Sequence, residues 1–591
     1  MQKVYFESIS MKIFYLLAVV IFFWLNFNYG LYGLDWTDST YHYQAAQNVI
    51  DGKVPHRDFH APVPGLSFVI EAQLLELVGN TYYVHRVLGF VILLLGVMGV
   101  CLAVAVWLVR ESTKSKAVVV LAYCISLLNT QAYFNYTDLG HVAAIWVLAT
   151  FGLIVNREER SRELFLVCVL GFLLAFTFSI KQSYGAPLFL AVLVLLPMTL
   201  YFRFQSFKNG VLIRLFALVF SFLASMSLFV TCISGKLWYG PLVGVSGGLQ
   251  LKGLSLSEPI EIIKTIIGVS STETFVLFIS SFFASFVVFH QSLRFPLLQV
   301  FICSGLIFAA VLCASFAALE SYLSFLIHYT CVSLLSYSVY FTIRYFKSLS
   351  RSRVSCIMGY STLGFVPIVS AQLSWPGIGY VISEYSIFYL LVLYILIISE
   401  VKAEFFSSHL YGWFVVAVFC LFVSVSVIGS VKEYRVYEWG GSHIELTQPS
   451  EFLGWRVHPD NREVVEKLQY HSDQCAGNSM FQIPWAPVVY ILTGRVNVTK
   501  YDLPYHDIID ERHADEIINT LEVSLPELIV IEPNYYDYQG PFPALGMKKI
   551  LAFLGAGYLK DYELVASLGA RFKTFEIYCR NSSAETIESR R

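Results

Sequence analysis

The chain has 591 residues, of which 56% are hydrophobic and only 14% are charged, and its formal net charge is -2. This balance excludes an ordinary soluble domain and indicates a polytopic membrane protein. It also excludes nucleic acid as a partner, because proteins that bind nucleic acid carry a basic stripe or patch.

Apolar segments long enough to cross a bilayer recur along the first 430 residues. A spanning helix needs about 20 apolar residues, so the sequence predicts a polytopic α-helical membrane domain with about 13 transmembrane helices over residues 1–430. The windows lie near 11–29, 87–109, 117–134, 138–155, 164–180, 185–202, 215–234, 272–290, 296–318, 322–343, 354–372, 386–400 and 410–430. We interpret the first window as a retained signal anchor, because no small-residue cleavage site follows it.

Basic residues in the short loops predict the orientation. Lys and Arg gather in the stretches 110–116, 157–162, 203–214 and 344–353, and they are sparse in the loops between. Because cytoplasmic loops carry the excess of Lys and Arg, the N-terminus is predicted to be cytoplasmic, with the first loop and the C-terminal tail on the outer face.

The first outer loop, residues 31–85, concentrates ionisable and turn-forming residues between two apolar segments. Helical spacing predicts a helix over Ser39–Asp51, with Gly52 as its C-cap, and a second helix over Leu66–Val78. Asp38 precedes the first helix. Two alternatives stay open for its carboxylate, which is either an N-cap or a functional group at the membrane surface.

The tail, residues 431–591, has a polar composition and is predicted to be an outer α/β domain. The apolar runs Ala486–Gly494 and Pro526–Pro533 are typical of strands, and Asn461–Tyr470 and Asp510–Glu522 have helical spacing. Cys475 and Cys579 are the two cysteines of this tail. A disulfide and two free thiols remain equal alternatives for them.

The first loop resembles the GT-C class of polyprenyl-phosphate-dependent glycosyltransferases, in particular the branch with protein O-mannosyltransferases and lipid A aminoarabinose transferases. The pattern is Asp38-Ser-Thr-Tyr-His-Tyr, then Ala45 to Phe59, a proline-rich turn, Arg86 opening the second span, and Lys181-Gln182 ending the fifth. The chain departs from many relatives in carrying Asp38-Ser39 where they have an Asp-Glu pair. Asp35 therefore competes with Asp38 for the first acidic position.

The resemblance implies an integral membrane glycosyltransferase of the inner (plasma) membrane, whose C-terminal domain is periplasmic. Its donor would be a polyprenyl-phosphate-linked hexose or pentose held among membrane lipids, and its acceptor an unidentified lipid, glycan or protein. The resemblance assigns the general base to Asp38, with Asp35 and Asp58 as alternatives.

The resemblance also suggests how the rest of the site is divided. Phosphate binding is assigned to Arg86, Lys181 and Arg57, although Arg86 is also explained as a snorkelling arginine and Arg57 as the ion-pair partner of Asp58. Contacts to the sugar or the acceptor are assigned to Tyr41, His42, His56, His60, Tyr133, Asp138 and His141. For Asp138 we favour a helix-capping role.

No cofactor and no metal are predicted. The histidines His42, His56 and His60 lack the helical spacing that a zinc site would need. Some GT-C relatives use a divalent cation and others do not.

A flippase or transporter of a lipid-linked sugar or small solute is the alternative function. Transporters place ionisable residues near the membrane midplane on broken helices and often contain repeated halves, whereas this chain gathers its charges in outer loops. A polymerase or ligase of lipid-linked sugars would place its functional loop late in the chain. The glycosyltransferase is therefore preferred.

Overall fold

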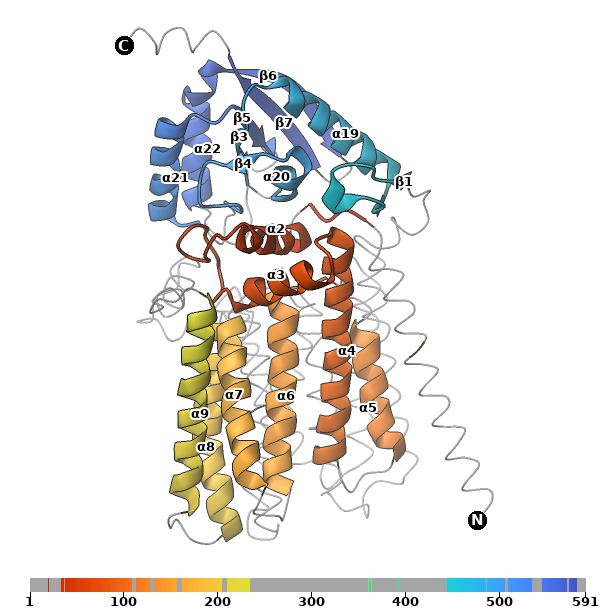
Figure 1. Cartoon of the computed structure of the whole chain (residues 1–591), viewed down its shortest axis with the longest axis vertical. Coiled ribbons are helices and arrows are strands. Elements are labelled where there is room, and N and C mark those ends of the chain that lie inside the picture. The colour runs from red at the N-terminus through yellow and green to blue at the C-terminus, as the bar shows by residue number, and fades with distance from the viewer. Residues whose placement is uncertain are drawn as a thin grey trace, which may run out of the picture.

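The structure is a computed structural model, and it describes part of the chain. The described residues are 20, 33–36, 38–108, 113–127, 133–156, 162–204, 210–233, 360, 363, 392, 444–484, 486–504, 509–533, 545–570 and 573–581. They form three layers (Figure 1): a bundle of long helices, two short helices lying across one end of that bundle, and a mixed α/β domain above them.

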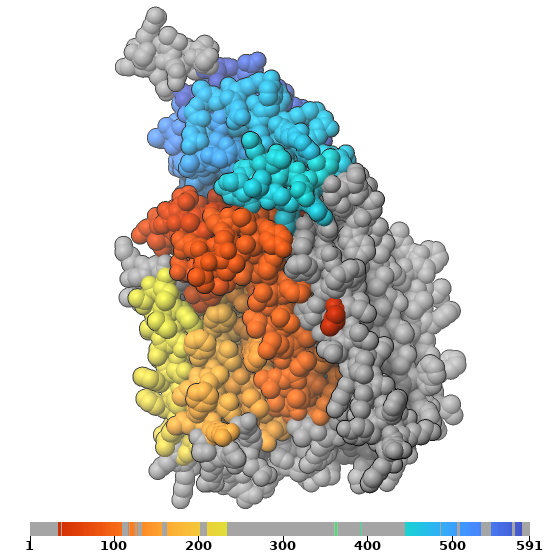
Figure 2. All heavy atoms as spheres, turned by 45° about the vertical axis from the view of Figure 1, so that its right-hand side comes forward, coloured from red at the N-terminus to blue at the C-terminus, as the bar shows by residue number. Residues whose placement is uncertain are grey.

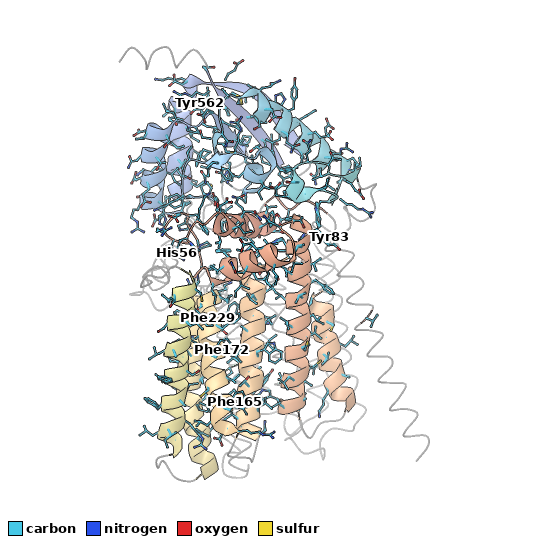
Figure 3. All side chains as sticks on the ribbon, viewed as in Figure 1. His56, Tyr83, Phe165, Phe172, Phe229 and Tyr562 are labelled. Carbon is cyan, nitrogen blue, oxygen red and sulfur yellow. A yellow bond between two sulfur atoms is a disulfide. The ribbon has the colours of Figure 1, made fainter. Side chains whose placement is uncertain are left out.

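Five helices of the described part are long and apolar enough to cross a membrane, namely α4, α6, α7, α8 and α9. With the shorter α5 they run side by side. Their bounds are α4 Tyr82–Trp107, α5 Thr113–Ser126, α6 Tyr136–Asn156, α7 Glu163–Ile180, α8 Gln182–Phe204 and α9 Gly210–Ile233. Side chains such as Phe165 and Phe172 (Figure 3), which are 69% and 42% exposed, protrude from α7 as lipid-facing residues do.

Five helices agree with predicted spans between 87 and 234, whereas α5 covers only part of the predicted span 117–134, whose residues 128–132 lie outside the described residues. One further difference concerns the site. Helix α4 begins at Tyr82, so Arg86 lies inside its second turn instead of opening the span. The first predicted span and the windows from 272 onward fall almost entirely outside the described residues. The total of about 13 spans therefore stays a prediction.

The two helices predicted in the first outer loop are confirmed. They are α2 Asp38–Ile50 and α3 Leu66–Val78. Gly52 has a φ of +80°, a left-handed conformation that glycine adopts without strain, and it ends α2 as expected of a C-cap glycine.

The C-terminal domain is built on a five-stranded mixed sheet in the order β4-β3-β5-β7-β6. Strand β3 pairs in parallel with β4 and β5, while β7 runs antiparallel to β5 and β6. The strands are β3 Ser479–Ile483, β4 Val496–Asn497, β5 Leu528–Ile531, β6 Tyr562–Ala570 and β7 Lys573–Arg580. A separate two-stranded sheet pairs β1 Ile444–Glu445 with β2 Arg456–Val457.

Helices cover both faces of the five-stranded sheet, because alternate residues of a strand point to opposite sides. Met480 and Val530 pack with α19 and α20, whereas Phe481 and Ile529 pack with α21 and α22. The helices are α19 Pro459–Gln474, α20 Val488–Thr493, α21 Glu511–Ser524 and α22 Leu545–Gly555, and the 3₁₀ turns are η2 Ser450–Phe452 and η4 Tyr558–Asp561.

One predicted element of this domain is wrong and one open question is answered. The run Ala486–Gly494 is the short helix α20, not a strand. Pro487 adopts a helical φ of −60° before it and Gly494 ends it in the left-handed region. A short apolar run does not distinguish helix from strand by periodicity. Cys475 and Cys579 form a disulfide, with their Cα atoms 5.4 Å apart.

The domain shares a hydrophobic core with the first outer loop. Leu34, Trp36, Tyr43 and Tyr82 belong to the same buried cluster as Trp455 and the residues under the sheet. Figure 2 shows the cyan and blue domain resting directly on the red and orange layer formed by the first loop. Residues 34–82 therefore pack against the C-terminal domain at the end of the helix bundle that carries α2 and α3.

Candidate active site

The first acidic position lies at the N-terminus of α2. The backbone N–H of Ser39 donates to Asp35 Oδ2 at 2.8 Å, so a carboxylate of the preceding segment binds the first turn. Asp38 is the first residue of α2, and it is exposed. The capping contact that was open for Asp38 is thus made by Asp35, and the Asp38 side chain lies on the exposed side of the first turn.

Arg86 is buried in the second turn of α4. It is 4% exposed, and its Nε and Nη1 atoms are buried without a hydrogen-bond partner among the described residues. Three rings surround the guanidinium at 5.5 to 5.9 Å, and they belong to Tyr82, Tyr133 and Trp455. Since a buried charge is normally paired, this arrangement fits a site that is completed by an anion.

A row of rings connects Arg86 with a second buried cation. Tyr133, beside Arg86, lies 5.8 Å from the His42 ring, and His42 lies 4.7 Å from Tyr136. The Lys181 Nζ atom is 5.5 Å from the Tyr136 ring and donates to Thr137 Oγ1 at 3.1 Å. Lys181 is 8% exposed and forms the single-residue junction between α7 and α8. Two of the three predicted phosphate-binding cations therefore lie at the ends of one row.

Carboxylates lie close to the middle of this row. Burial raises the pKa of Tyr133 well above its usual value. Nearby negative charges raise it further, and they belong to Asp38, Asp35 and Asp138. Tyr133 is held in place by a close approach to α4: a Cβ atom added at Gly89 would lie 2.1 to 2.3 Å from the Tyr133 backbone. The structure thus brings the predicted acidic residues and Tyr133 to one place.

His42 and Tyr41 add buried polar atoms that face no protein partner. His42 Nδ1 and Tyr41 Oη have no hydrogen-bond partner in the described part of the chain, and the residues are each 4% exposed. Burial, and then the charge of Lys181, lower the pKa of His42 to about 3. A neutral imidazole at neutral pH is suited to exchange hydrogen bonds with a sugar hydroxyl.

Asp138 is not the N-cap that we favoured. Asn135 caps α6 instead, because its Oδ1 accepts from the Asp138 backbone N–H at 2.7 Å and its amide donates to Asp138 Oδ2 at 2.5 Å. An Asn side chain competes well for this position. His141, one turn further along α6, is fully buried, and its ring lies 6.5 Å from that of Tyr123.

The remaining predicted residues lie in the stretch between α2 and α3. Arg57 donates to both carboxylate oxygens of Asp58, at 2.8 and 2.6 Å, and its side chain is 55% exposed. His60 packs against the C-terminal domain, with its ring 5.1 Å from Tyr501, and His56 adopts a left-handed φ of 66° in the preceding turn (labelled in Figure 3).

Asp58 is poorly suited to act as a base. Its hydrogen bonds from Arg57 and from the Val54 backbone lower its pKa to about 2. A general base works best when its pKa lies near the operating pH. Asp38 therefore remains the stronger candidate.

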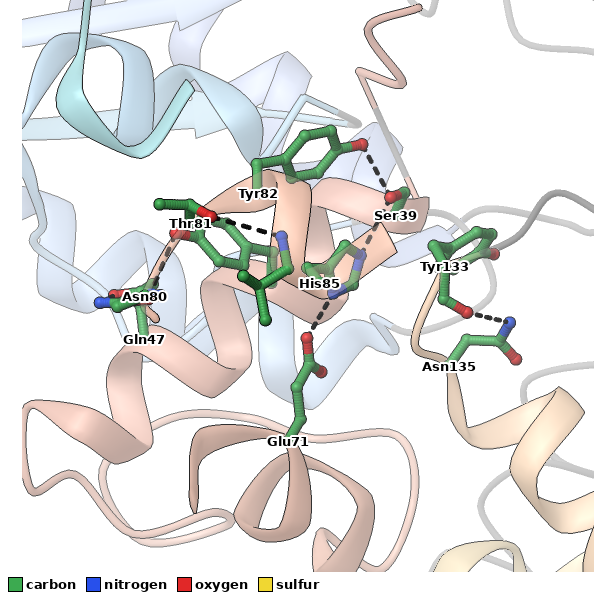
Figure 4. A network of polar contacts seen from close by, with 11 residues as sticks. Ser39, Gln47, Glu71, Asn80, Thr81, Tyr82, His85, Tyr133 and Asn135 are labelled. Carbon is green, nitrogen blue, oxygen red and sulfur yellow. Dashed lines mark hydrogen bonds and ion pairs between the residues drawn. The ribbon is translucent and has the colours of Figure 1, made fainter. Parts of the chain in front are cut away.

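Several residues that shape the site were not predicted from the sequence. Trp455 reaches Arg86 from the C-terminal domain, and its Nε1 donates to the Gly33 carbonyl at 2.8 Å. Asn48 of α2 donates to the buried Asp502 of that domain at 2.6 Å. Glu71 and His85 form a buried pair behind Ser39 (Figure 4). The Glu within the apolar first half of α3 was the one available signal, since a buried carboxylate needs a partner.

The described residues do not offer a metal site. They contain no group of three or more His, Cys, Asp or Glu side chains placed to hold a metal ion.

Comparison with solved structures finds the same fold in a membrane glycosyltransferase. The chain is similar to the oligosaccharyltransferase of Archaeoglobus fulgidus, solved with Zn and sulfate, with a TM-score of 0.50, 11% identity, and coverage of 96% of this chain and 73% of that one. It is also similar to ArnT of Cupriavidus metallidurans bound to undecaprenyl phosphate, with a TM-score of 0.47, 10% identity, and coverage of 97% and 98%.

The match to the oligosaccharyltransferase, a GT-C glycosyltransferase, agrees with the resemblance to the GT-C class at the level of the fold. No protein-family model and no curated protein sequence matches the chain.

Proposed function

We propose that this protein is an integral membrane glycosyltransferase that moves a sugar from a polyprenyl-phosphate donor to an acceptor on the outer face of the membrane. The observation that carries the proposal is Arg86, a buried guanidinium in the second turn of α4 with two nitrogens that have no hydrogen-bond partner among the described residues. A lipid phosphate is an anion that resides at this depth, where the hydrocarbon of the lipid meets its charged head group.

The site is suited to both halves of a transfer reaction. The acceptor O–H gives its proton to the Asp38 carboxylate while its oxygen bonds to the anomeric carbon of the donor sugar. The bond between that carbon and the phosphate oxygen breaks, and the lipid phosphate leaves with the electron pair. Arg86 stabilises the charge that develops on the phosphate, and a fixed cation there favours the transition state over the ground state.

The row between Arg86 and Lys181 is the proposed sugar subsite. Aromatic rings present an apolar face with polar tips, and His42 and Tyr41 offer hydrogen-bonding atoms that no described residue uses. The predicted contacts from Tyr133, Asp138 and His141 belong to the same region. Lys181 is placed to bind the sugar or a second phosphate oxygen.

The larger topology completes the proposal. We infer about 13 spans, a cytoplasmic N-terminus and a C-terminal domain on the periplasmic side of an inner (plasma) membrane, from the span windows and the loop charges. The Cys475–Cys579 disulfide supports the outer placement, because disulfides persist in oxidising compartments.

The test does not require the sugar to be known. Purified protein is reconstituted with a lipid extract and an envelope fraction of the native host, and the release of free polyprenyl phosphate is followed by mass spectrometry. The wild type is expected to release it and Asp38→Asn is not. Equal release by both proteins contradicts the role of Asp38, and movement of an intact lipid-linked sugar across the membrane without release favours the transporter.

A further inference from the structure

A chain of four fully buried polar side chains links three helices behind the site (Figure 4). Ser39 Oγ lies 2.7 Å from Tyr82 Oη and 3.1 Å from His85 Nε2, and His85 Nδ1 is hydrogen-bonded to the Glu71 carboxyl group. All four residues are 0% exposed. They come from α2, α3 and α4, so the network ties both short helices of the outer layer to the first long helix.

Filling a core with such a network is energetically unfavourable. Burying polar side chains costs free energy unless each is hydrogen-bonded, and apolar residues of similar volume would pack there without that cost. Glu71 Oε2 has no hydrogen-bond partner among the described residues, and burial raises the pKa of Glu71 well above its usual value. What a connected polar network provides in return is a specified geometry.

The positions of the two central residues indicate what that geometry serves. Ser39 directly follows Asp38, the proposed base, and His85 directly precedes Arg86, the proposed phosphate ligand. Adjacent Cα atoms are about 3.8 Å apart, so the Ser39–His85 contact fixes the spacing of their neighbours closely.

We propose that Ser39, His85 and Glu71 are positioning residues that hold the Asp38 carboxylate and the Arg86 guanidinium at the separation that sugar transfer requires. This inference rests on the proposed function. The base and the cation sit on different helices, and a shift of about 1 Å between reacting groups lowers a rate by about 10²-fold. Glu71 supports the imidazole from α3, and the imidazole supports the first turn of α2 through Ser39.

The order Ser–His–Glu also resembles a nucleophilic triad, but the surroundings of Ser39 do not suit that role. Its hydroxyl is 0% exposed and lies between the Tyr82 hydroxyl and the His85 ring, so a substrate carbonyl has no access to it. A nucleophile must reach the reacting atom.

The chain offers a matched control for the test. Gln47 of α2 and Asn80, which lies just before α4, exchange two hydrogen bonds, one of them at 2.8 Å, and this pair also ties α2 to the start of α4. Its two hydrogen bonds are exposed, and Gln47 lies more than two turns along α2 from Asp38. Gln47→Ala therefore weakens the attachment of α2 without disturbing the proposed spacing.

The experiment measures three quantities on the full-length protein in lipid nanodiscs: the rate of polyprenyl phosphate release, the affinity for undecaprenyl phosphate, and the melting temperature. Ser39→Ala is expected to slow release by about 10²-fold while leaving the affinity within about twofold, because Arg86 stays in place and only its distance to Asp38 changes. Ser39→Thr keeps the hydroxyl and is expected to restore most of the rate. Gln47→Ala is expected to release at the wild-type rate.

Two results would overturn the inference. One is a wild-type rate in Ser39→Ala when Asp38→Asn is inactive. The other is a parallel loss of rate, affinity and melting temperature in both Ser39→Ala and Gln47→Ala, which would make the network merely structural. Should Ser39→Ala fail to fold, Glu71→Ala applies the same test from α3, with Glu71→Gln as its conservative partner. A wild-type rate in Asp38→Asn would instead contradict the proposed function.

Discussion

Two arginines of the first outer layer show how differently the same side chain can be placed. Arg86 is 4% exposed, has two nitrogens without a hydrogen-bond partner among the described residues, and is enclosed by rings from α4, from Tyr133 and from the C-terminal domain. Arg57 lies in an exposed turn and gives two hydrogen bonds to its neighbour Asp58. The charge of Arg57 is satisfied by its neighbour, whereas the buried charge of Arg86 has no acidic partner among the contacts of the described residues. Burial without a hydrogen-bond partner in the described part of the chain, and not charge alone, is what makes Arg86 the proposed phosphate ligand.

Removal of the proposed base, Asp38, has the largest expected effect. Asp38→Asn keeps the size of the side chain but cannot accept a proton, and we expect it to slow polyprenyl phosphate release by about 10²–10⁴-fold. Asp58→Asn, in the exposed turn, is the matched control and should release at the wild-type rate. Loss of activity in Asp58→Asn alone would move the base to the turn.

The two arginines themselves give the next largest effect. Arg86→Ala removes the charge that stabilises the leaving phosphate, and we expect release to slow by about 10²–10³-fold with weaker binding of undecaprenyl phosphate. Arg57→Ala removes an exposed ion pair and should change the rate by less than about twofold. Equal losses in both variants would show that burial does not distinguish them.

Trp455 provides a test of whether the C-terminal domain contributes to the site around Arg86. Its ring lies 5.6 Å from the Arg86 guanidinium, and losing one buried cation–π contact weakens the hold on Arg86. We expect Trp455→Ala to reduce the affinity for undecaprenyl phosphate by about tenfold, and Trp455→Phe to retain most of it. Binding titrations of both variants with undecaprenyl phosphate test this expectation. An unchanged affinity in Trp455→Ala would show that the C-terminal domain does not contribute to phosphate binding through Trp455.

The two regions should also respond to acid over different ranges. The pKa of His42 is lowered from 6.5 to about 3 in the folded protein, so the unfolded chain binds more protons between these values and the folded state loses stability as the pH falls through that window. His42→Asn lacks this titration, and its melting temperature should fall less steeply than that of the wild type between pH 6.5 and 4. The pKa of Asp58 is lowered from 3.8 to about 2, so Asp58→Asn should not change the slope in that range.

Removal of divalent cations gives the smallest expected effect. The described residues contain no cluster suited to a metal ion, and we predict that incubation with EDTA changes the rate of release by less than about twofold. A rate that falls on chelation and returns with one added cation would require a ligand set beyond the described residues.

The sequence predicted local features of the site far better than their assembly. Helices α2 and α3 followed from spacing, from Gly52 and from the prolines between them, because these signals act within a few residues. The row from Arg86 to Lys181 depends on Tyr133, His42 and Tyr136 meeting from separate elements, which no local pattern specifies. Trp455 was not predicted for the same reason, because it is far from Arg86 in the sequence and contacts it only in the folded protein.

Errors in the predictions have local causes. Helix α20 was read as a strand because a six-residue apolar run satisfies both periods. Asp138 was read as a cap, although Asn135 three residues earlier makes that contact. For α20, two conformations suit the same run of residues, and for α6, two residues suit the same capping role. Only the tertiary structure shows which one occurs.

We propose that the site between Asp38 of α2 and Arg86 of α4 binds the phosphate of a lipid-linked sugar and transfers the sugar. Mass spectrometry of the lipids that co-purify from native membranes with Asp38→Asn, compared with the Asp38→Asn/Arg86→Ala double variant, tests it most directly. We expect a polyprenyl phosphate carrying one sugar to co-purify with the single variant and to be absent from the double variant. Bulk phospholipid on both proteins, from membranes shown to contain the donor, would contradict it.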